Sequence, residues 1–210
     1  MSRGAPAYHV KVGLREKKAA RTHAHIRDVA LALFLDRGYD ETTMEEIAER
    51  AEVGTSTLYR YFPAKDQILL GSVDDHLGGL ATYLRARPAD EPLPVALGNA
   101  IRDAAETRPV NDSQLLAIRT IVDRAAAPRA RLWDILAKER EELEREIAAR
   151  LGRQPDDVHV VLTARTALNI MEVASDRWRA SDHRTSIAEL AESIMTELGA
   201  TGVVLPAARG

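Results

Sequence analysis

The side chains best suited to chemistry lie together in the run Thr-Ser-Thr-Leu-Tyr-Arg-Tyr from Thr55 to Tyr61, which holds hydroxyls, phenols and a guanidinium but no acid. If this run is helical, Leu58 and Phe62 fall four residues apart and face inward. The outward and marginal positions are then Thr55, Ser56, Thr57, Tyr59, Arg60 and Tyr61. Small hydroxyls allow close approach to a DNA major groove, and threonine methyls can contact thymine methyls there. An ordinary helical hairpin with a polar solvent face would carry the same pattern, so the pattern alone favours both interpretations about equally.

Two short helices joined by a tight turn would position these side chains. Thr43 and Glu46 have the spacing of a capping box, which predicts that the first helix begins at Thr43. The inward face of this helix consists of residues at helical spacing, namely Met44, Ile47, Ala48 and Ala51. Gly54 tolerates the left-handed backbone of a sharp turn, and either Gly54 or Thr55 can cap the second helix. Pro63 ends that helix, because the residue before a proline leaves helical geometry. In a helix-turn-helix unit the second helix enters the groove.

Two blocks of this stretch closely resemble the DNA-binding domain of the TetR family of transcriptional repressors. They are Thr42-Thr-Met-Glu-Glu-Ile-Ala48 and Val53-Gly-Thr-Ser-Thr-Leu-Tyr-Arg-Tyr-Phe-Pro-Ala-Lys-Asp66, and the resemblance extends over about residues 14 to 75. Gly54 departs from the family, which more often has a serine or another capping residue there. The resemblance implies an all-α homodimer that binds a palindromic double-stranded DNA operator and responds to a small-molecule effector.

The resemblance also implies a role for individual side chains. Those expected to face bases are Thr55, Ser56, Thr57 and Tyr59. Those expected to hold phosphates are Thr43, Arg60, Tyr61 and Lys65. Phosphate contacts set the register on the duplex but carry no sequence information. A helix-capping role for Thr43 is compatible with its phosphate role.

Charge is unevenly distributed although the formal net charge is only −3. Residues 1–27 carry seven lysines and arginines against one acid, whereas residues 28–62 carry three against eight acids. We expect the acids on surfaces away from the second helix, and we expect the basic arm to supply most of the sequence-independent attraction to DNA. The alternative interpretation is that the basic arm is a solvated tail that does not contact DNA. His23 and His25, two residues apart, are expected to be exposed or DNA-facing and are poor joint metal ligands.

Composition argues against several other classes of protein. The 210 residues include no cysteine, which excludes a disulfide framework, thiolate metal sites and a cysteine nucleophile. A membrane-spanning run and a secretory signal are absent, so a cytoplasmic location is expected. A glycine-rich phosphate loop and a serine nucleophile elbow are also absent, so we expect no enzyme, no cofactor and no metal. The remaining alternative is a helical protein-interaction module without DNA-regulated function.

The predicted architecture is all-α, with an N-terminal three-helix helix-turn-helix domain and a C-terminal helical ligand-binding and dimerisation domain. The expected segments are a basic arm at 1–14, the DNA-binding domain at 15–63, the ligand-binding and dimerisation domain at 64–200 and a tail at 201–210. Outside the central hairpin, helices are expected at 15–37, 65–87, 94–107, 112–124, 128–151, 156–180 and 186–198. Gly71, Gly78 and Gly79 within the 65–87 helix suit either close packing or a bend.

The C-terminal domain offers weaker signals for an effector. Only three aromatic residues follow Pro63, which favours a flexible apolar molecule such as an acyl chain over a planar one. These three residues, Tyr83, Trp133 and Trp178, could line a pocket or belong to the core. Arg165 and Asn169 could meet a polar head group, or could lie at the surface or in a dimer interface.

The 156–180 helix has a broad apolar face that must be covered on two sides. Its central line is expected at Val161, Ala164, Leu168 and Met171. The resemblance implies that the last two helices of each subunit form a four-helix dimer interface. The core of a single subunit would explain the same pattern.

Overall fold

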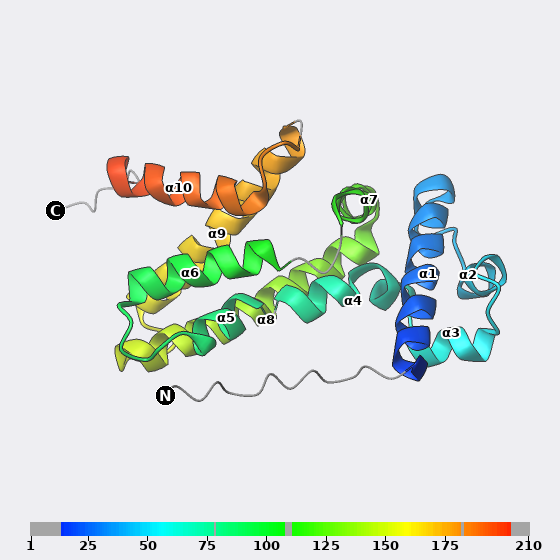
Figure 1. Ribbon diagram of the computed structural model, residues 1–210, viewed down its shortest axis with the longest axis horizontal. Helices are drawn as coiled ribbons and strands as arrows, with labels where there is room; N and C mark the ends of the chain where they lie inside the picture. The colour runs from blue at the N-terminus through cyan, green and yellow to red at the C-terminus, as the bar shows by residue number, and fades with distance from the viewer. Residues whose placement is uncertain (1–13, 78, 108–110, 182, 203–210) are drawn as a thin grey trace, which may run out of the picture. The chain divides into compact units, whose positions relative to one another are not determined.

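The computed structural model describes residues 14–77, 79–107, 111–181 and 183–202, with side chains for all of these except 14–17 and 72–77. Every regular element in these ranges is an α-helix, which confirms the all-α prediction (Figure 1). The helices are α1 (Leu14–Arg37), α2 (Met44–Arg50), α3 (Thr55–Tyr61), α4 (Lys65–Leu77), α5 (Gly79–Ala86), α6 (Leu93–Glu106), α7 (Asp112–Arg124), α8 (Ala126–Leu151), α9 (Val158–Ala180) and α10 (Ile187–Thr201). The chain divides within α4 into two compact units, one ending at Leu69 and the other starting at Leu70.

The first unit is organised around one face of α1. Ile26, Ala30 and Phe34 are buried at helical spacing, α2 packs on α1, and α3 packs on α2. Gly38 ends α1 with φ +98°, a conformation that favours glycine. The next residue, Tyr39, is buried with its ring centroid 5.0 Å from that of Phe34.

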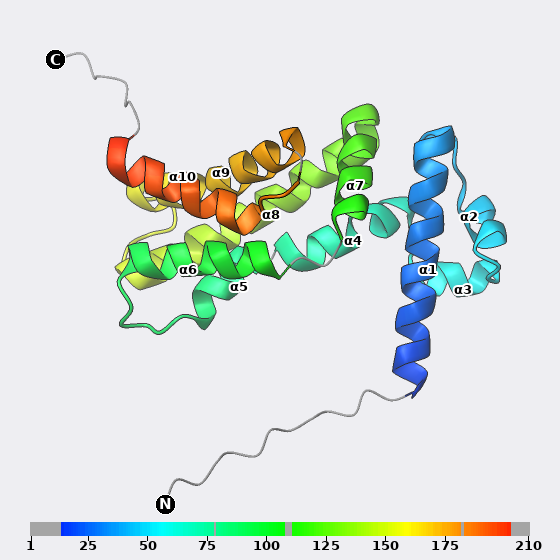
Figure 2. The same cartoon turned by 45° about the horizontal axis from the view of Figure 1, so that its top comes forward.

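The second unit has a separate core that is almost entirely aliphatic. Helix α10 packs along α6 and α9, α5 lies against α6 and α8, and α7 packs on α8 (Figure 2). The core includes Leu84, Ile101, Leu143 and Ile147, with Trp178 as its one buried tryptophan among the residues described. None of the described helices combines the length and apolar character needed to cross a membrane.

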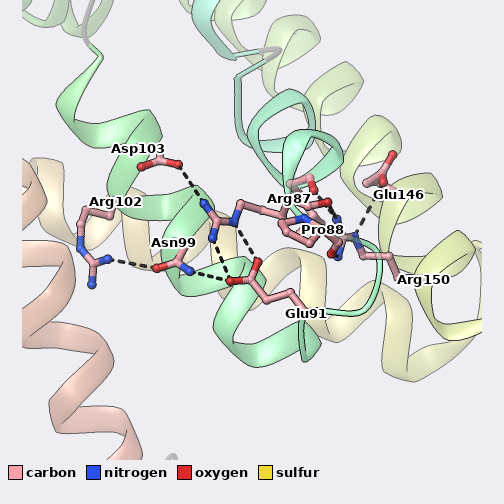
Figure 3. A network of polar contacts seen from close by, with 9 residues as sticks. Arg87, Pro88, Glu91, Asn99, Arg102, Asp103, Glu146 and Arg150 are labelled. Carbon is pink, nitrogen blue, oxygen red and sulfur yellow. Dashed lines mark hydrogen bonds and ion pairs between the residues drawn. The ribbon is translucent and has the colours of Figure 1, made fainter. Parts of the chain in front are cut away.

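Side chains of α8 hold both ends of α5. At the N-terminal end the buried carboxylate of Glu139 accepts a hydrogen bond from the amide of Ala81 at 3.2 Å. At the other end the guanidinium of Arg150 donates to three carbonyl oxygens, those of Leu84, Arg87 and Pro88 (Figure 3). A carboxylate at the start of a helix and a cation at its end both complement the helix dipole. Burial raises the pKa of Glu139 to about 7.

A polar network joins the end of α5 to α6. The guanidinium of Arg87 donates two hydrogen bonds of 2.8 Å to the carboxylate of Glu91. The side-chain amide of Asn99 on α6 donates to the same carboxylate at 2.9 Å (Figure 3). These hydrogen bonds, with Arg87 the largest cause, lower the pKa of Glu91. The polar network of Arg87, Glu91 and Asn99 therefore helps to hold the connection between α5 and α6.

The helix expected at 65–87 is described as α4 and α5 on the two sides of Gly78, which lies outside the described residues. One prediction about the second unit was wrong: the buried face of α9 is rotated from the expected one. Its buried members are Val160, Ala164, Ala167, Ile170, Ala174 and Trp178. Because apolar residues surround much of this helix, periodicity left its rotation open, and the packing of α8 and α10 decided it.

Candidate nucleic-acid interface

The start of α2 is fixed by a capping box, as predicted. The Thr43 hydroxyl oxygen accepts from the Glu46 amide at 3.2 Å, and the Thr43 amide donates to the Glu46 carboxylate at 2.9 Å. This backbone hydrogen bond is the largest cause of a lowered pKa at Glu46. The same carboxylate accepts from the Arg37 guanidinium at 2.8 Å, which ties α2 to the end of α1.

The turn between α2 and α3 differs from the prediction in which residue bends the chain. The left-handed conformation belongs to Glu52, with φ +53°, whereas Gly54 is extended with φ −64° and ψ 140°. The amide of Val53 donates to the Ala48 carbonyl at 3.0 Å, so this residue closes the end of α2. Gly54 is the N-cap of α3 and makes no side-chain capping bond. Its lack of a side chain leaves the start of α3 open to an approaching surface.

Helix α3 buries Leu58, and most of its polar side chains remain exposed. Leu58 is 0% and Phe62 2% exposed, while Tyr59 is 43% exposed. Among the other predicted contact residues, the exposed ones are Thr43, Thr55, Ser56 and Arg60, and the half-buried ones are Thr57, Tyr61 and Lys65. Three of the four side chains assigned to bases, Thr55, Ser56 and Tyr59, are thus exposed, and contact of all four with DNA stays a prediction.

One acid does reach this surface, contrary to expectation. The Tyr59 hydroxyl donates to the carboxylate of Glu45, on the exposed side of α2, at 3.2 Å. Partial desolvation and the Glu45 carboxylate raise the pKa of Tyr59. The two residues are 14 positions apart and lie on opposite sides of the turn, so only the folded arrangement of α2 and α3 shows this pair.

The C-terminal end of α3 lies against α1 through aromatic rings. The His23 ring centroid is 4.1 Å from that of Phe62 and 6.2 Å from that of Tyr61. His23 is half-buried and His25 is exposed, and whether either faces DNA stays a prediction. The guanidinium carbon of Arg60 lies 5.5 Å from the Tyr61 ring, which positions the cation at the outer edge of the helix.

Lys65, the last of the predicted phosphate contacts, is turned toward the protein. Its ammonium donates to the backbone carbonyls of Tyr39 at 2.7 Å, Thr42 at 2.8 Å and Asp40 at 3.3 Å. The same nitrogen lies 4.7 Å from the centroid of the Tyr39 ring. The residues next to Lys65 in the sequence do not predict these contacts, because the three carbonyls lie 23 to 26 residues earlier in the chain.

Helix α1 adds two cations, Lys18 and Arg21, to the surface of the first unit. Lys18, Arg21 and His25 line a shallow hollow of about 900 Å³ whose other edge includes Asp28 and Val53, the residue before Gly54. Cationic side chains beside the turn that precedes α3 suit a phosphate backbone. Residues 1–13 of the basic arm lie outside the described residues.

The second unit has an open groove of about 530 Å³ between α6, α9 and α10. Its apolar wall includes Leu97, Ile101, Leu162, Ile170, Met195 and Leu198, and its polar edge includes His159, Thr163 and Thr166. Nowhere in the described chain do three histidine, aspartate or glutamate side chains gather as metal ligands would.

The five residues proposed for effector contact do not share this groove. Trp178 is in the core, 4.5 Å from the His183 ring, and Tyr83 on α5 is half-buried. Trp133 on α8 is 67% exposed. The exposed side of α9 carries the remaining two, Arg165 and Asn169. Their contact with an effector stays a prediction, and the groove residues were missed because they come from three separate helices.

Comparisons with known proteins add an independent observation. Residues 26–71, which include the interface, match the family model described as bacterial regulatory proteins, tetR family. The HTH-type transcriptional regulator TcmR of Streptomyces glaucescens is 32% identical over 151 residues, which cover 69% of this chain and 67% of TcmR. The putative mycofactocin biosynthesis transcriptional regulator MftR of Mycobacterium tuberculosis is 25% identical over 191 residues, covering 88% and 92% of the two chains.

A solved structure of related sequence has the same fold. The structure of Thermus thermophilus FadR, a TetR family transcriptional repressor in complex with lauroyl-CoA, matches with a TM-score of 0.53 and 28% identity. The match covers 90% of this chain and 98% of the FadR chain.

Proposed function

Since the chain belongs to the TetR family of transcriptional regulators, we propose that it is a repressor that binds a palindromic operator as a homodimer and is released by a small effector. Membership confirms the resemblance seen in residues 42–66, and it identifies a DNA-binding regulator rather than an enzyme. The observation that carries the proposal is the outward face of α3, which Leu58 and Phe62 hold away from the core.

The proposed division of labour follows the chain. Residues 1–14 act as a basic arm, 15–63 bind DNA, 64–200 bind the effector and the partner subunit, and 201–210 form a tail. In the DNA-binding part, base edges are contacted by Thr55, Ser56, Thr57 and Tyr59. Thr43, Arg60 and Tyr61 hold phosphates, which fixes the register of α3 in the groove.

Dimerisation is proposed through α9 and α10. Val158 and Leu162 on α9 are 62% and 56% exposed, and Leu162 also lines the groove shared with α6 and α10. Apolar side chains of this size are normally covered, and a second copy of the same face would cover them. The two α3 helices of a dimer would then lie about 34 Å apart, one DNA turn, as a palindrome requires.

The effector is proposed to be a flexible apolar molecule with a polar end, of the acyl type. Thermus thermophilus FadR, which was solved with lauroyl-CoA, supports this class, as does the aliphatic core of the second unit. Tyr83, Trp133, Arg165, Asn169 and Trp178 remain the proposed contacts. Release requires that the effector bind more tightly to a conformer whose α3 spacing no longer fits the operator, because only differential affinity shifts an equilibrium.

The proposal is tested by footprinting and mobility shift on the DNA upstream of the gene at two salt concentrations. We expect a protected palindrome and an affinity that falls steeply with salt. Adding acyl-CoAs of increasing chain length should release the DNA at one range of lengths. A helical interaction module without DNA function would show neither protection nor salt dependence.

A further inference from the structure

The ammonium group of Lys65 has no donor left for a DNA phosphate. A lysine ammonium carries three hydrogen-bond donors and no acceptor. Three carbonyl oxygens, of Tyr39, Asp40 and Thr42, lie within 2.7 to 3.3 Å of this nitrogen. The group is half-buried, and the Tyr39 ring covers it at 4.7 Å. Moving to a phosphate would leave these carbonyls without their partner and expose the ring face.

The three carbonyls belong to the connection between α1 and α2. This connection starts after Gly38 and ends at Thr43, the N-cap of α2, so it contains no helical hydrogen bonds of its own. The hydroxyl of Thr42 donates back to the Gly38 carbonyl at 2.8 Å, which completes a folded loop around the ammonium. A cation near the C-terminal end of α1 is also favoured by the helix dipole. The Lys65 ammonium is therefore the shared hydrogen-bond donor that holds the α1–α2 connection in its folded conformation.

We propose that Lys65 is a positioning residue that fastens the first turn of α4 to the α1–α2 connection and so holds α2 and α3 in place, rather than a phosphate contact. Lys65 is the first residue of α4, and α4 is the segment of chain that leads from the first unit into the second. A displacement of the first turn of α4 is passed through Lys65 to Thr42, then to the capping box at Thr43, and from there to α2 and α3. The inference rests on the proposed function, because it explains how an effector-dependent shift reaches the DNA-reading helix.

The test compares Lys65→Met with Arg60→Met, a matched removal of one cation at an exposed position of α3. Both variants are titrated on operator and on random DNA at several salt concentrations. Loss of one phosphate contact in each subunit lowers the salt slope by about 1.8, and we expect this for Arg60→Met. For Lys65→Met we expect an unchanged slope, with operator affinity about tenfold lower and random-DNA affinity less affected, because register is lost rather than attraction.

Hydrogen exchange on the free proteins gives a second measurement. In Lys65→Met the amides of residues 47–51 in α2 should exchange about tenfold faster, while those of α8 in the second unit keep their wild-type rates. Arg60→Met should leave both sets unchanged. A drop of the Lys65→Met slope by about 1.8, or α2 exchange at the wild-type rate, would overturn the proposal.

A measurement on the unmodified protein covers the case in which Lys65→Met does not fold. The ¹⁵N resonance of the Lys65 ammonium, which is protected from rapid proton exchange by its three acceptors, should keep its position when operator DNA is added. A shift of that resonance on DNA binding would place the ammonium on a phosphate. If the wild-type protein binds no DNA, the proposed function fails, whereas the exchange of α2 still decides the positioning role.

Discussion

At the scale of single residues, the contact between Glu45 and Tyr59 limits what the reading helix can recognise. A phenol has one proton to donate, and here the proton goes to the Glu45 carboxylate. The remaining lone pairs of the Tyr59 oxygen can only accept hydrogen bonds. The donors that bases offer in the major groove are the amino groups of cytosine and adenine. Tyr59 is therefore expected to face one of these two bases in each half-site.

Selection of binding sites from random-sequence DNA tests this expectation. Tyr59→Phe removes the oxygen and should relax the preference at one base pair of each half-site, lowering operator affinity roughly tenfold. Glu45→Ala leaves the oxygen but frees its proton, so the preference should move toward guanine or thymine at the same pair. Identical preferences in wild type and both variants would show that this hydroxyl reads no base.

Two substitutions at Thr43 distinguish its role as a helix cap from its proposed role as a phosphate contact. Thr43→Ala removes the capping acceptor and should lower the free energy of unfolding by about 1 kcal/mol, whereas Thr43→Ser should retain it. Urea unfolding followed by circular dichroism measures this difference. If the hydroxyl also holds a phosphate, the affinity for operator and for random DNA falls in the alanine variant and not in the serine variant, at an unchanged salt slope because a neutral hydroxyl releases no counterion. Equal affinities of the two variants would leave only the cap.

At the scale of elements, α5 is fastened to α8 by one acidic and one basic side chain. Glu139 accepts from the first turn of α5, and Arg150 donates to the carbonyls at its end. The second carboxylate oxygen of Glu139 is buried without a hydrogen-bond partner, which favours the protonated form. The attachment of α5 therefore includes a group whose protonation changes near neutral pH.

This carboxyl makes stability depend on pH in a defined direction. The folded protein keeps a proton on Glu139 up to about pH 7, whereas the unfolded chain releases it near the ordinary value of 4.5. The stability contributed by this group is full below the unfolded pKa and is lost as pH rises toward the folded pKa. The free energy of unfolding should therefore fall by up to about 3 kcal/mol between pH 5 and 8, relative to Glu139→Gln. Urea unfolding at each pH measures this difference. The control Glu141→Gln, at an exposed position of α8, should have the same pH dependence of unfolding free energy as the wild type. If Glu139→Gln also showed the wild-type pH dependence, the prediction would be contradicted.

At the scale of the whole molecule, the proposed repression needs two subunits, and the exposed apolar residues of α9 define the proposed contact surface. Leu162 is large, more than half exposed and part of the groove wall. A charge placed at the centre of such a surface is buried without a partner on association. Trp133 on α8 is also exposed, at 67%, but lies outside the groove, so it provides a comparison of similar character.

Sedimentation of Leu162→Glu and Trp133→Glu tests the assignment. Leu162→Glu should sediment as a monomer at concentrations where wild type is a dimer, and its operator affinity should fall at least a hundredfold because each half-site is then bound alone. Trp133→Glu should remain dimeric with wild-type affinity. A dimeric Leu162→Glu would move the interface to another face.

The amino-acid sequence by itself determined the features that depend on near neighbours. The capping box of Thr43 and Glu46, the inward pair Leu58 and Phe62 and the stop at Gly38 each involve residues at most four apart, where helical spacing and backbone preference decide the outcome. For this reason the helix-turn-helix and the family were predicted from this region, and helical spacing along the rest of the chain completed the all-α prediction.

Only the tertiary structure decided the contacts between residues far apart in the chain. The Lys65 ammonium meets a carbonyl 26 residues away, and Glu139 meets an amide 58 residues away. A long side chain can extend in many directions from a helix. Helical periodicity predicts the face on which the side chain lies, but it does not predict the residue that the side chain contacts. The rotation of α9 was open for a related reason: a helix that is apolar over most of its circumference is oriented by its neighbours, not by its own pattern.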